Sequence, residues 1–208
     1  MARRLEATPH GMVAPYRLSF LVGGLLAAEA AIAAPVYLQC RDWAETRAAL
    51  EKDNLLHART QASAVRTARE LVQRVACLSD DEVEYLVAAP SPDRKHLMWA
   101  AFCRRYDLVA EFAEEALRDR FLLGDLHLVP DDFERFWAGK ALWHPELDAV
   151  AASTRTKLRT NLFLALRQSG MLTTAGLIVP PLLSDVLVKL LQARTPSDIR
   201  FFPAGGTQ

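Results

Sequence analysis

Residues 91–122 read SPDRKHLMWAAFCRRYDLVAEFAEEALRDRFL, and this stretch decides the fold class. Its apolar residues recur at helical spacing, as at Leu97, Ala101, Val109 and Phe112, rather than with the alternation of a strand. The Ser-Pro-Asp sequence at its beginning is typical of a helix N-terminus. The pattern predicts one long helix over the whole stretch.

The rest of the chain carries the same helical signature. Its 208 residues are rich in Ala, Leu, Arg and Glu, which favour helices, and include only nine Gly. Two signals mark helix starts: Asp42 is a good N-cap, and Ser79 with Glu82 forms a capping box. We therefore expect a mostly α-helical protein, a multi-helix bundle, with further helices over about 25–38, 42–54, 60–78, 79–89, from 130 onward, 153–170 and 182–193.

The C-terminal region resembles the exit from a winged-helix recognition helix. Gly170 and the apolar residue after it form the pattern of a left-handed helix C-cap. A turn follows, and then residues 177–179, which are expected to form a short strand. We expect the bundle to contain helix-turn-helix-like and winged-helix-like parts. The chain should divide into four regions: a mobile leader (1–15), an N-terminal helical, helix-turn-helix-like region (16–80), a central acidic region with the long helix (81–150) and a C-terminal winged-helix-like region (151–208).

A nearly continuous apolar run, residues 18–38, has the length of a membrane span. The alternative to a buried helix here is a membrane span or a signal peptide. Glu29 inside the run would cost about 2.5 kcal/mol or more in a bilayer, and Gly23, Gly24 and Pro35 weaken a spanning helix. We expect a buried helix and no membrane association. The three cysteines lack paired spacing, which favours a reducing cytoplasm.

The sequence contains no recognisable catalytic or metal-binding motif. The adjacent acids Asp131 and Asp132 follow a proline, so we interpret them as capping a helix rather than as a catalytic pair. Trp99, Trp137 and Trp143 are aromatic residues that can stack on bases, but their spacing among apolar neighbours favours core packing. We expect no enzyme activity, no cofactor and no small-molecule substrate.

The zero net charge of the chain hides strong segregation. Residues 57–76 hold four arginines against one acid, residues 153–170 hold four cations and no acid, and residues 107–148 hold eleven acids against four bases. A basic surface on an otherwise soluble protein is what binding to a polyanion requires.

The two basic segments differ in how their charges are compensated. In the first, Glu70 lies one helical turn from Arg66 and Arg74, and we expect all three on a solvated face. In the second, Arg155 and Arg159 lie near the helix start, where cations oppose the helix dipole and no acid in the helix pairs with them. We therefore expect the second segment to contribute more to binding a polyanion.

Four ordered blocks of the sequence resemble one known family. They are YRLSFLVGGLL from Tyr16, DNLLHARTQASAVRTARELVQRV from Asp53, MWAAFCRRYDLVAEFAEEALRDRF from Met98 and STRTKLRTNLFLALRQSGML from Ser153. The blocks resemble the BrxA family of bacterial BREX bacteriophage-exclusion systems, over nearly the whole chain. The resemblance implies an all-helical protein that binds DNA, is similar in part to the RNA-binding antitermination factor NusB, and has no known catalytic activity.

We therefore expect a non-catalytic, cytoplasmic accessory protein of phage defence that binds double-stranded DNA, with other BREX proteins as further partners. Two alternatives remain open: an RNA-binding, NusB-like module, and an assembly adaptor that docks proteins through its acidic middle without binding nucleic acid. The resemblance supplies no contact residues, so the candidates come from the charge pattern. They are Arg59, Ser63, Arg66, Arg69, Arg155, Thr156, Lys157 and Arg159.

Overall fold

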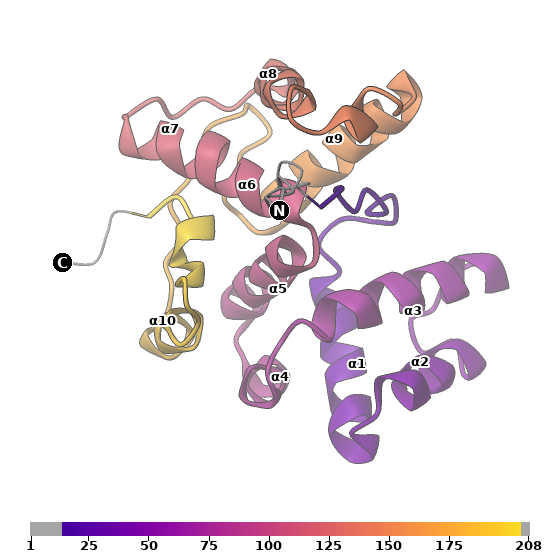
Figure 1. Cartoon of the computed structure of the whole chain (residues 1–208). Coiled ribbons are helices and arrows are strands. Elements are labelled where there is room, and N and C mark those ends of the chain that lie inside the picture. Colours follow the sequence, from indigo (N-terminus) through magenta and orange to yellow (C-terminus); the bar gives the residue numbers. More distant parts are fainter. Residues whose placement is uncertain (1–13, 205–208) are drawn as a thin grey trace, which may run out of the picture.

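A computed structural model describes residues 14–204 and shows a mostly helical protein (Figure 1), which confirms the expected fold class. Helix α5 lies at the centre and packs against helices from both ends of the chain. The elements are α1 (Ala27–Cys40), α2 (Trp43–Lys52), α3 (Gln61–Val75), α4 (Asp80–Ala88), α5 (Ser91–Arg105), α6 (Asp107–Phe112), a π-helical turn (Ala113–Arg118), α7 (Asp119–Leu122), α8 (Pro130–Ala141), a 3-10 turn (Pro145–Leu147), α9 (Ala152–Gln168), α10 (Asp185–Gln192) and a second 3-10 turn (Asp198–Phe201).

The predicted caps at Asp42 and Ser79 are confirmed by their hydrogen bonds, whereas Ser91 begins α5 without a side-chain capping bond. The Asp42 carboxylate accepts from the backbone amides of the first turn of α2. At α4 the Ser79 hydroxyl accepts from the Glu82 amide, and the Glu82 carboxylate accepts from the Ser79 amide at 2.8 Å, so the capping box is complete. The Asp132 carboxylate likewise accepts from the Val129 amide at the start of α8. Such caps satisfy amides that the helix itself leaves unpaired.

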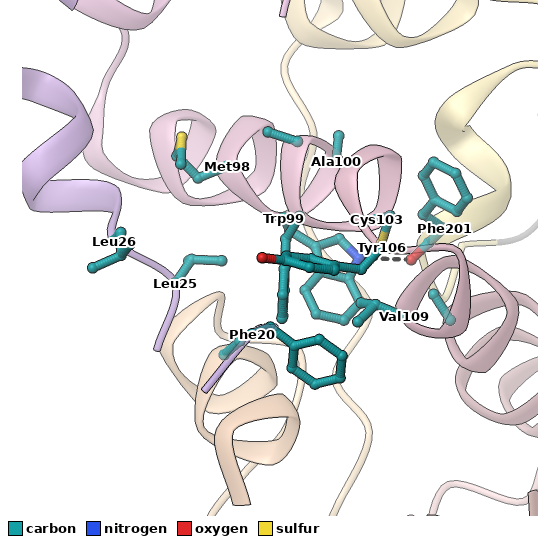
Figure 2. Close-up of a cluster of buried hydrophobic side chains, with 14 of the residues drawn as sticks. Phe20, Leu25, Leu26, Met98, Trp99, Ala100, Cys103, Tyr106, Val109 and Phe201 are labelled. Atoms are coloured by element: carbon teal, nitrogen blue, oxygen red, sulfur yellow. Dashed lines mark hydrogen bonds between the residues drawn. The ribbon is translucent and has the colours of Figure 1, made fainter. Parts of the chain in front are cut away.

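The buried side chains form one contiguous cluster that draws on the N-terminal, central and C-terminal regions. Figure 2 shows its centre, where Trp99 and Tyr106 lie beside Phe20 from the N-terminal segment and Phe201 from the C-terminal one. The indole Nε1 of Trp99 donates to the Phe201 carbonyl at 2.9 Å. Both ends of the described chain are therefore tied to α5.

The prediction of one helix over 91–122 is wrong at Tyr106. This residue has an extended backbone (φ −131°, ψ 102°) and separates α5 from α6. The break directs the Tyr106 side chain into the core, where its hydroxyl donates to the Glu70 carboxylate at 2.7 and 2.8 Å. A buried carboxylate needs such donors, and this tertiary demand overrides the helical pattern of the sequence.

The C-terminal region shows the predicted cap but not a wing. Gly170 has φ 82°; its amide donates to the Arg167 carbonyl and the Met171 amide to the Leu166 carbonyl, which is the Schellman pattern. The expected strand at 177–179 contributes only isolated bridges, Leu172–Ile178 and His127–Leu177. Within residues 14–204 no strand is formed, and the winged-helix detail is not confirmed.

The apolar run 18–38 is divided between an irregular segment and α1, which begins at Ala27 and has 14 residues. Across residues 14–204, the structure contains no helix with both the length and the apolar character needed to cross a bilayer. Of the predicted leader, residues 1–13 lie outside the described chain.

Candidate nucleic-acid interface

The basic surface of α3 comes from residues that the sequence singled out. Arg66 and Arg69 are exposed on the helix, and Arg59 is exposed just before it. Ser63, expected as a neutral phosphate donor, is instead used locally: its hydroxyl donates to the Thr60 carbonyl at 2.7 Å within the N-cap. The arginines are thus available to a ligand, whereas the Ser63 proton is engaged in the cap.

Glu70 and Arg74 do not lie on the solvated face, so this part of the prediction is wrong. Both are buried. Arg74 Nε donates to Glu70 Oε1 at 2.7 Å, its Nη1 donates to the Gly24 carbonyl at 2.6 Å, and its guanidinium lies 4.1 Å from the centre of the Phe102 ring. The pair turns inward because distant groups supply the partners that a buried charge requires.

The charge of Glu70 is therefore compensated inside the protein. Burial and the neighbouring Glu70 carboxylate raise the pKa of Tyr106 to about 12, so its hydroxyl stays protonated and donates to Glu70. Within the described chain, neither Arg66 nor Arg69 forms an ion pair with an acid. They border a surface hollow of about 220 Å³, whose lining residues are Ser19, Val22, Arg66, Arg69, Glu70 and Gln73.

The basic surface of α9 has an acidic partner that its own helix does not reveal. Glu134 on α8 binds two of the candidate arginines, Arg155 Nε at 3.2 Å and Arg159 Nη1 at 2.6 Å. Thr156 and Lys157 are exposed, and Lys157 forms no ion pair with any acid in residues 14–204. As the sequence indicates, α9 itself contains no acid; the partner of Arg155 and Arg159 comes from α8, which the sequence alone does not place beside them.

The irregular N-terminal segment fixes α3 and α9 relative to each other. This segment, drawn in indigo in Figure 1, runs between the two helices. From the α9 side, Asn161 Nδ2 donates to the Phe20 carbonyl at 3.0 Å, and Gln168 Oε1 accepts from the Leu25 amide at 2.6 Å. From the α3 side, Arg74 donates to the Gly24 carbonyl. A Cβ at Gly24 would lie 1.9 Å from Gln168 Oε1, so a larger residue here would displace the end of the Gln168 side chain from its bond to the Leu25 amide.

The structure also reveals cations that the sequence reasoning did not select. Arg167 is exposed near the end of α9 and borders a small hollow of about 150 Å³ together with Arg159. Arg167 and Lys95 of α5 also line a larger hollow of about 560 Å³ at the start of α1. The basic content of 153–170 pointed to Arg167, but no sequence signal places Lys95 beside it.

The three tryptophans considered from the sequence differ in burial. Trp99 and Trp137 are buried in the core, as expected. Trp143 is 77% exposed, so the expectation of core packing is wrong for this residue. It follows the end of α8, beyond the part of the helix that packs inward.

Comparison with known proteins gives a family and a fold. The model of the BrxA family matches residues 14–195. A crystal structure of an uncharacterized protein from Magnetospirillum magneticum superposes with a TM-score of 0.79 at 18% sequence identity, covering 92% of this chain and 100% of that one. The search of the curated proteins returned no match. The family match spans most of the sequence, and the chain therefore belongs to the BrxA family.

Proposed function

We propose that the protein is a non-catalytic accessory component of BREX phage defence that binds double-stranded DNA through the basic surfaces of α3 and α9. Membership in the BrxA family associates the chain with BREX systems and their other proteins. The DNA-binding role rests on the charges of the surface. Contacts to phosphate would position the protein on a duplex without selecting a sequence.

One observation supports the proposal most directly. Arg66 and Arg69 are exposed beside a hollow, while the only acid on their helix, Glu70, is buried and bonded to Arg74 and Tyr106. With no acid paired to them in the described chain, both guanidinium groups are free to bind phosphate, whose oxygens match the planar group.

The structure also changes the expected ranking of the two surfaces. The sequence favoured α9 because its arginines had no acid in their own helix. Glu134 partly neutralises Arg155 and Arg159, whereas nothing in the described chain neutralises Arg66 and Arg69. We therefore propose α3 as the main phosphate-binding surface and α9 as the second.

The test is a titration of a labelled DNA duplex at several salt concentrations, followed by fluorescence anisotropy. If about four to six phosphates are contacted, log K falls against log salt with a slope of about −4 to −5. Arg66→Gln/Arg69→Gln should weaken binding at least about tenfold and make the slope shallower by about 2, since each lost phosphate contact removes about 0.9. Arg155→Gln/Arg159→Gln should have a smaller effect.

A matched control separates local contacts from net charge. Lys52 and Lys189 are both exposed and form no ion pair within residues 14–204, so Lys52→Gln/Lys189→Gln removes the same charge elsewhere. An α3 variant that binds no worse than this control would exclude α3 as the contact surface. Tighter binding of RNA of equal length would favour the NusB-like alternative, and no salt-dependent binding at all would favour an assembly adaptor.

A further inference from the structure

The exposed arginines of α3 lie on one stripe of the helix, and this stripe continues beyond them. Arg66 and Arg69 are followed by Gln73, at spacings of three and then four residues, which place all three on the same side of the helix. Gln73 lines the hollow of about 220 Å³ together with both arginines. A neutral side chain thus occupies the next position along the stripe.

Gln73 holds a third arginine at that position. Arg105, the last residue of α5, donates from Nη2 to Gln73 Oε1 at 3.0 Å. Its guanidinium makes no other hydrogen bond and no ion pair with residues 14–204, and its Nε is buried without a partner. Because the side-chain amide of glutamine carries no charge, the bond orients the guanidinium and leaves its positive charge uncompensated.

A fourth arginine reaches the same end of α3 from the N-terminal segment. Arg17 is exposed and forms no ion pair within the described chain, and Ser19, two residues later, lines the hollow. Burial raises the pKa of the Cys77 thiol just after α3, and the charges of Arg105 and Arg17 are among those that oppose this rise. Both arginines therefore lie near the C-terminal end of α3. They form an arginine cluster with the two of the helix: Arg17, Arg66, Arg69 and Arg105.

The acids near Arg105 do not cancel these charges. Glu70, the only acid of α3, is buried and bonded to Arg74 and Tyr106. Asp107 lies two residues beyond Arg105 and is exposed, with no ion pair in the part of the chain that the structure describes. It lines a separate hollow that no residue of α3 borders.

Two further acids face the N-terminal segment that carries Arg17. Glu111 accepts from the Tyr16 hydroxyl and is paired with a lysine of α8. Glu146 accepts from the Tyr16 amide at 3.0 Å, and no lysine or arginine within residues 14–204 pairs with it. When Asp107 and Glu146 are both counted in full against the arginine cluster, two positive charges remain.

We propose that the arginine cluster is one continuous phosphate-binding track, in which Arg105 and Arg17 extend the α3 surface along the phosphates of one strand of a DNA duplex. This inference rests on the proposed DNA binding. At a rise of about 1.5 Å per residue, the stripe from Arg66 to Gln73 is about 10 Å long. Each strand of a duplex carries one charge per about 3.4 Å of its axis, so the stripe spans roughly three phosphates. Gln73 is a positioning residue, which holds the guanidinium of Arg105 in line with the stripe.

The first test is the titration of a labelled duplex with single-arginine variants. Arg105→Gln and Arg17→Gln should each weaken binding about fivefold and make the slope of log K against log salt shallower by about 0.9, because each removes one phosphate contact. Arg94→Gln is the matched control. Arg94 lies on the same helix as Arg105, about 16 Å away along its axis. It likewise donates from Nη2 to a neutral acceptor, the Ala89 carbonyl, and has no ion pair within the described chain. This control should bind as the parent does.

The role of Gln73 is tested without a change of charge. Gln73→Leu should weaken duplex binding about threefold in the parent, since the guanidinium of Arg105 loses the acceptor that orients it. In the Arg105→Gln background the same substitution should have no further effect. An equal loss in both backgrounds would show that Gln73 acts independently of Arg105 and would exclude the positioning role.

Chemical labelling tests the track in the unaltered protein, where no variant has to fold. Phenylglyoxal modifies accessible guanidinium groups, and mass spectrometry locates the modified residues. Duplex DNA should protect Arg17 and Arg105 to the same degree as Arg66, and should leave Arg94 as reactive as in the free protein. Protection of Arg66 without protection of Arg17 and Arg105 would end the track at Arg69.

The failures of the two proposals are distinguishable. If the parent binds duplex with the expected salt slope and Arg66→Gln/Arg69→Gln weakens binding, but Arg105→Gln and Arg17→Gln bind no worse than Arg94→Gln, the track is excluded and the proposed function stands. If the parent binds no duplex, both proposals fail. If RNA of equal length protects the arginine cluster more strongly than the duplex does, the duplex is not the ligand of the track and this inference is excluded.

Discussion

At the scale of single residues, two Arg–Glu pairs with the same helical spacing have opposite roles. Arg47 and Glu51 on α2 lie 3.0 Å apart, and Arg47 is about half exposed. Arg74 and Glu70 on α3 lie 2.7 Å apart and are buried. The sequence cannot separate the two cases, because the groups that make burial tolerable for Arg74, the Gly24 carbonyl and the Phe102 ring, are distant in the chain.

Replacing the arginine of each pair by methionine should distinguish the buried pair from the exposed one by the loss in free energy of unfolding. Arg74→Met leaves the Glu70 carboxylate buried without its main partner and should lower the free energy of unfolding by about 3–5 kcal/mol. Arg47→Met breaks a surface pair and should cost at most about 1 kcal/mol. Urea unfolding followed by circular dichroism measures both; equal losses would contradict the burial of the Arg74–Glu70 pair.

At the scale of elements, the sequence located the helices well and their interruptions poorly. Capping residues are local signals, so the starts of α2 and α4 could be read directly at Asp42 and Ser79. The break at Tyr106 could not, because its cause is the buried Glu70 carboxylate, which is 36 residues away in the sequence. The expected strand at 177–179 forms only isolated bridges, because its two partners, His127 and Leu172, belong to different segments of the chain.

Substitutions at two glycines would test how tightly the segments joined by these bridges are packed. Gly176 (φ 83°) and Gly124 (φ 77°) both have left-handed backbones, but a Cβ at Gly176 would lie 2.9 Å from the Leu128 carbonyl oxygen, and one at Gly124 would meet no atom within 4 Å. Gly124→Ala should cost about 1–2 kcal/mol from backbone strain alone. Gly176→Ala should cost roughly 1–3 kcal/mol more from the clash.

Thermal unfolding of the two glycine variants gives the comparison. A lower midpoint for Gly176→Ala than for Gly124→Ala is the expected order. Indistinguishable midpoints would show that the segment before α8 moves freely from the turn at Gly176, contrary to the 2.8 Å hydrogen bond from the Leu128 amide to the Gly176 carbonyl.

At the scale of the whole molecule, the sequence revealed the segregation of charge but not its pairing. The acidic middle and the two basic segments could be counted directly. Glu134 partly neutralises Arg155 and Arg159 because α8 lies against α9. Arg66 and Arg69 have no paired acid in the described chain because Glu70 turns inward. The sequence therefore nominates the candidate cations, whereas which of them are paired with acids is visible only in the fold.

The response of the protein to acid depends on contacts that join distant parts of the chain. Arg104 on α5 joins distant parts of the chain: its Nη2 donates to Glu82 Oε1 on α4 at 2.5 Å, and its Nε donates to Asp198 Oδ2 near the C-terminus at 2.6 Å. Burial alone would raise the pKa of Glu82, but the hydrogen bonds and charge of Arg104 outweigh it and lower that pKa below its ordinary value of 4.5.

Because the pKa of Glu82 is lower in the folded protein than in the unfolded chain, the unfolded chain takes up the proton first as pH falls. The stabilisation by Glu82 is therefore fully present above about pH 4.5 and is lost as pH falls through the folded pKa. Glu82→Gln should lower the free energy of unfolding at pH 7 by about 3 kcal/mol, as expected for breaking a buried pair, and should flatten its decline below pH 4.5.

Glu84 provides the matched control for this variant, since it lies on the same helix and forms an exposed pair with Arg41. Glu84→Gln should cost at most about 1 kcal/mol at pH 7 and keep the acid dependence of the parent. The measurement is urea unfolding of all three proteins at pH 7, 4.5 and 3.5. A parent-like decline in Glu82→Gln would locate the acid sensitivity elsewhere, and Arg104 would then act through Asp198 alone in joining α5 to the C-terminal segment.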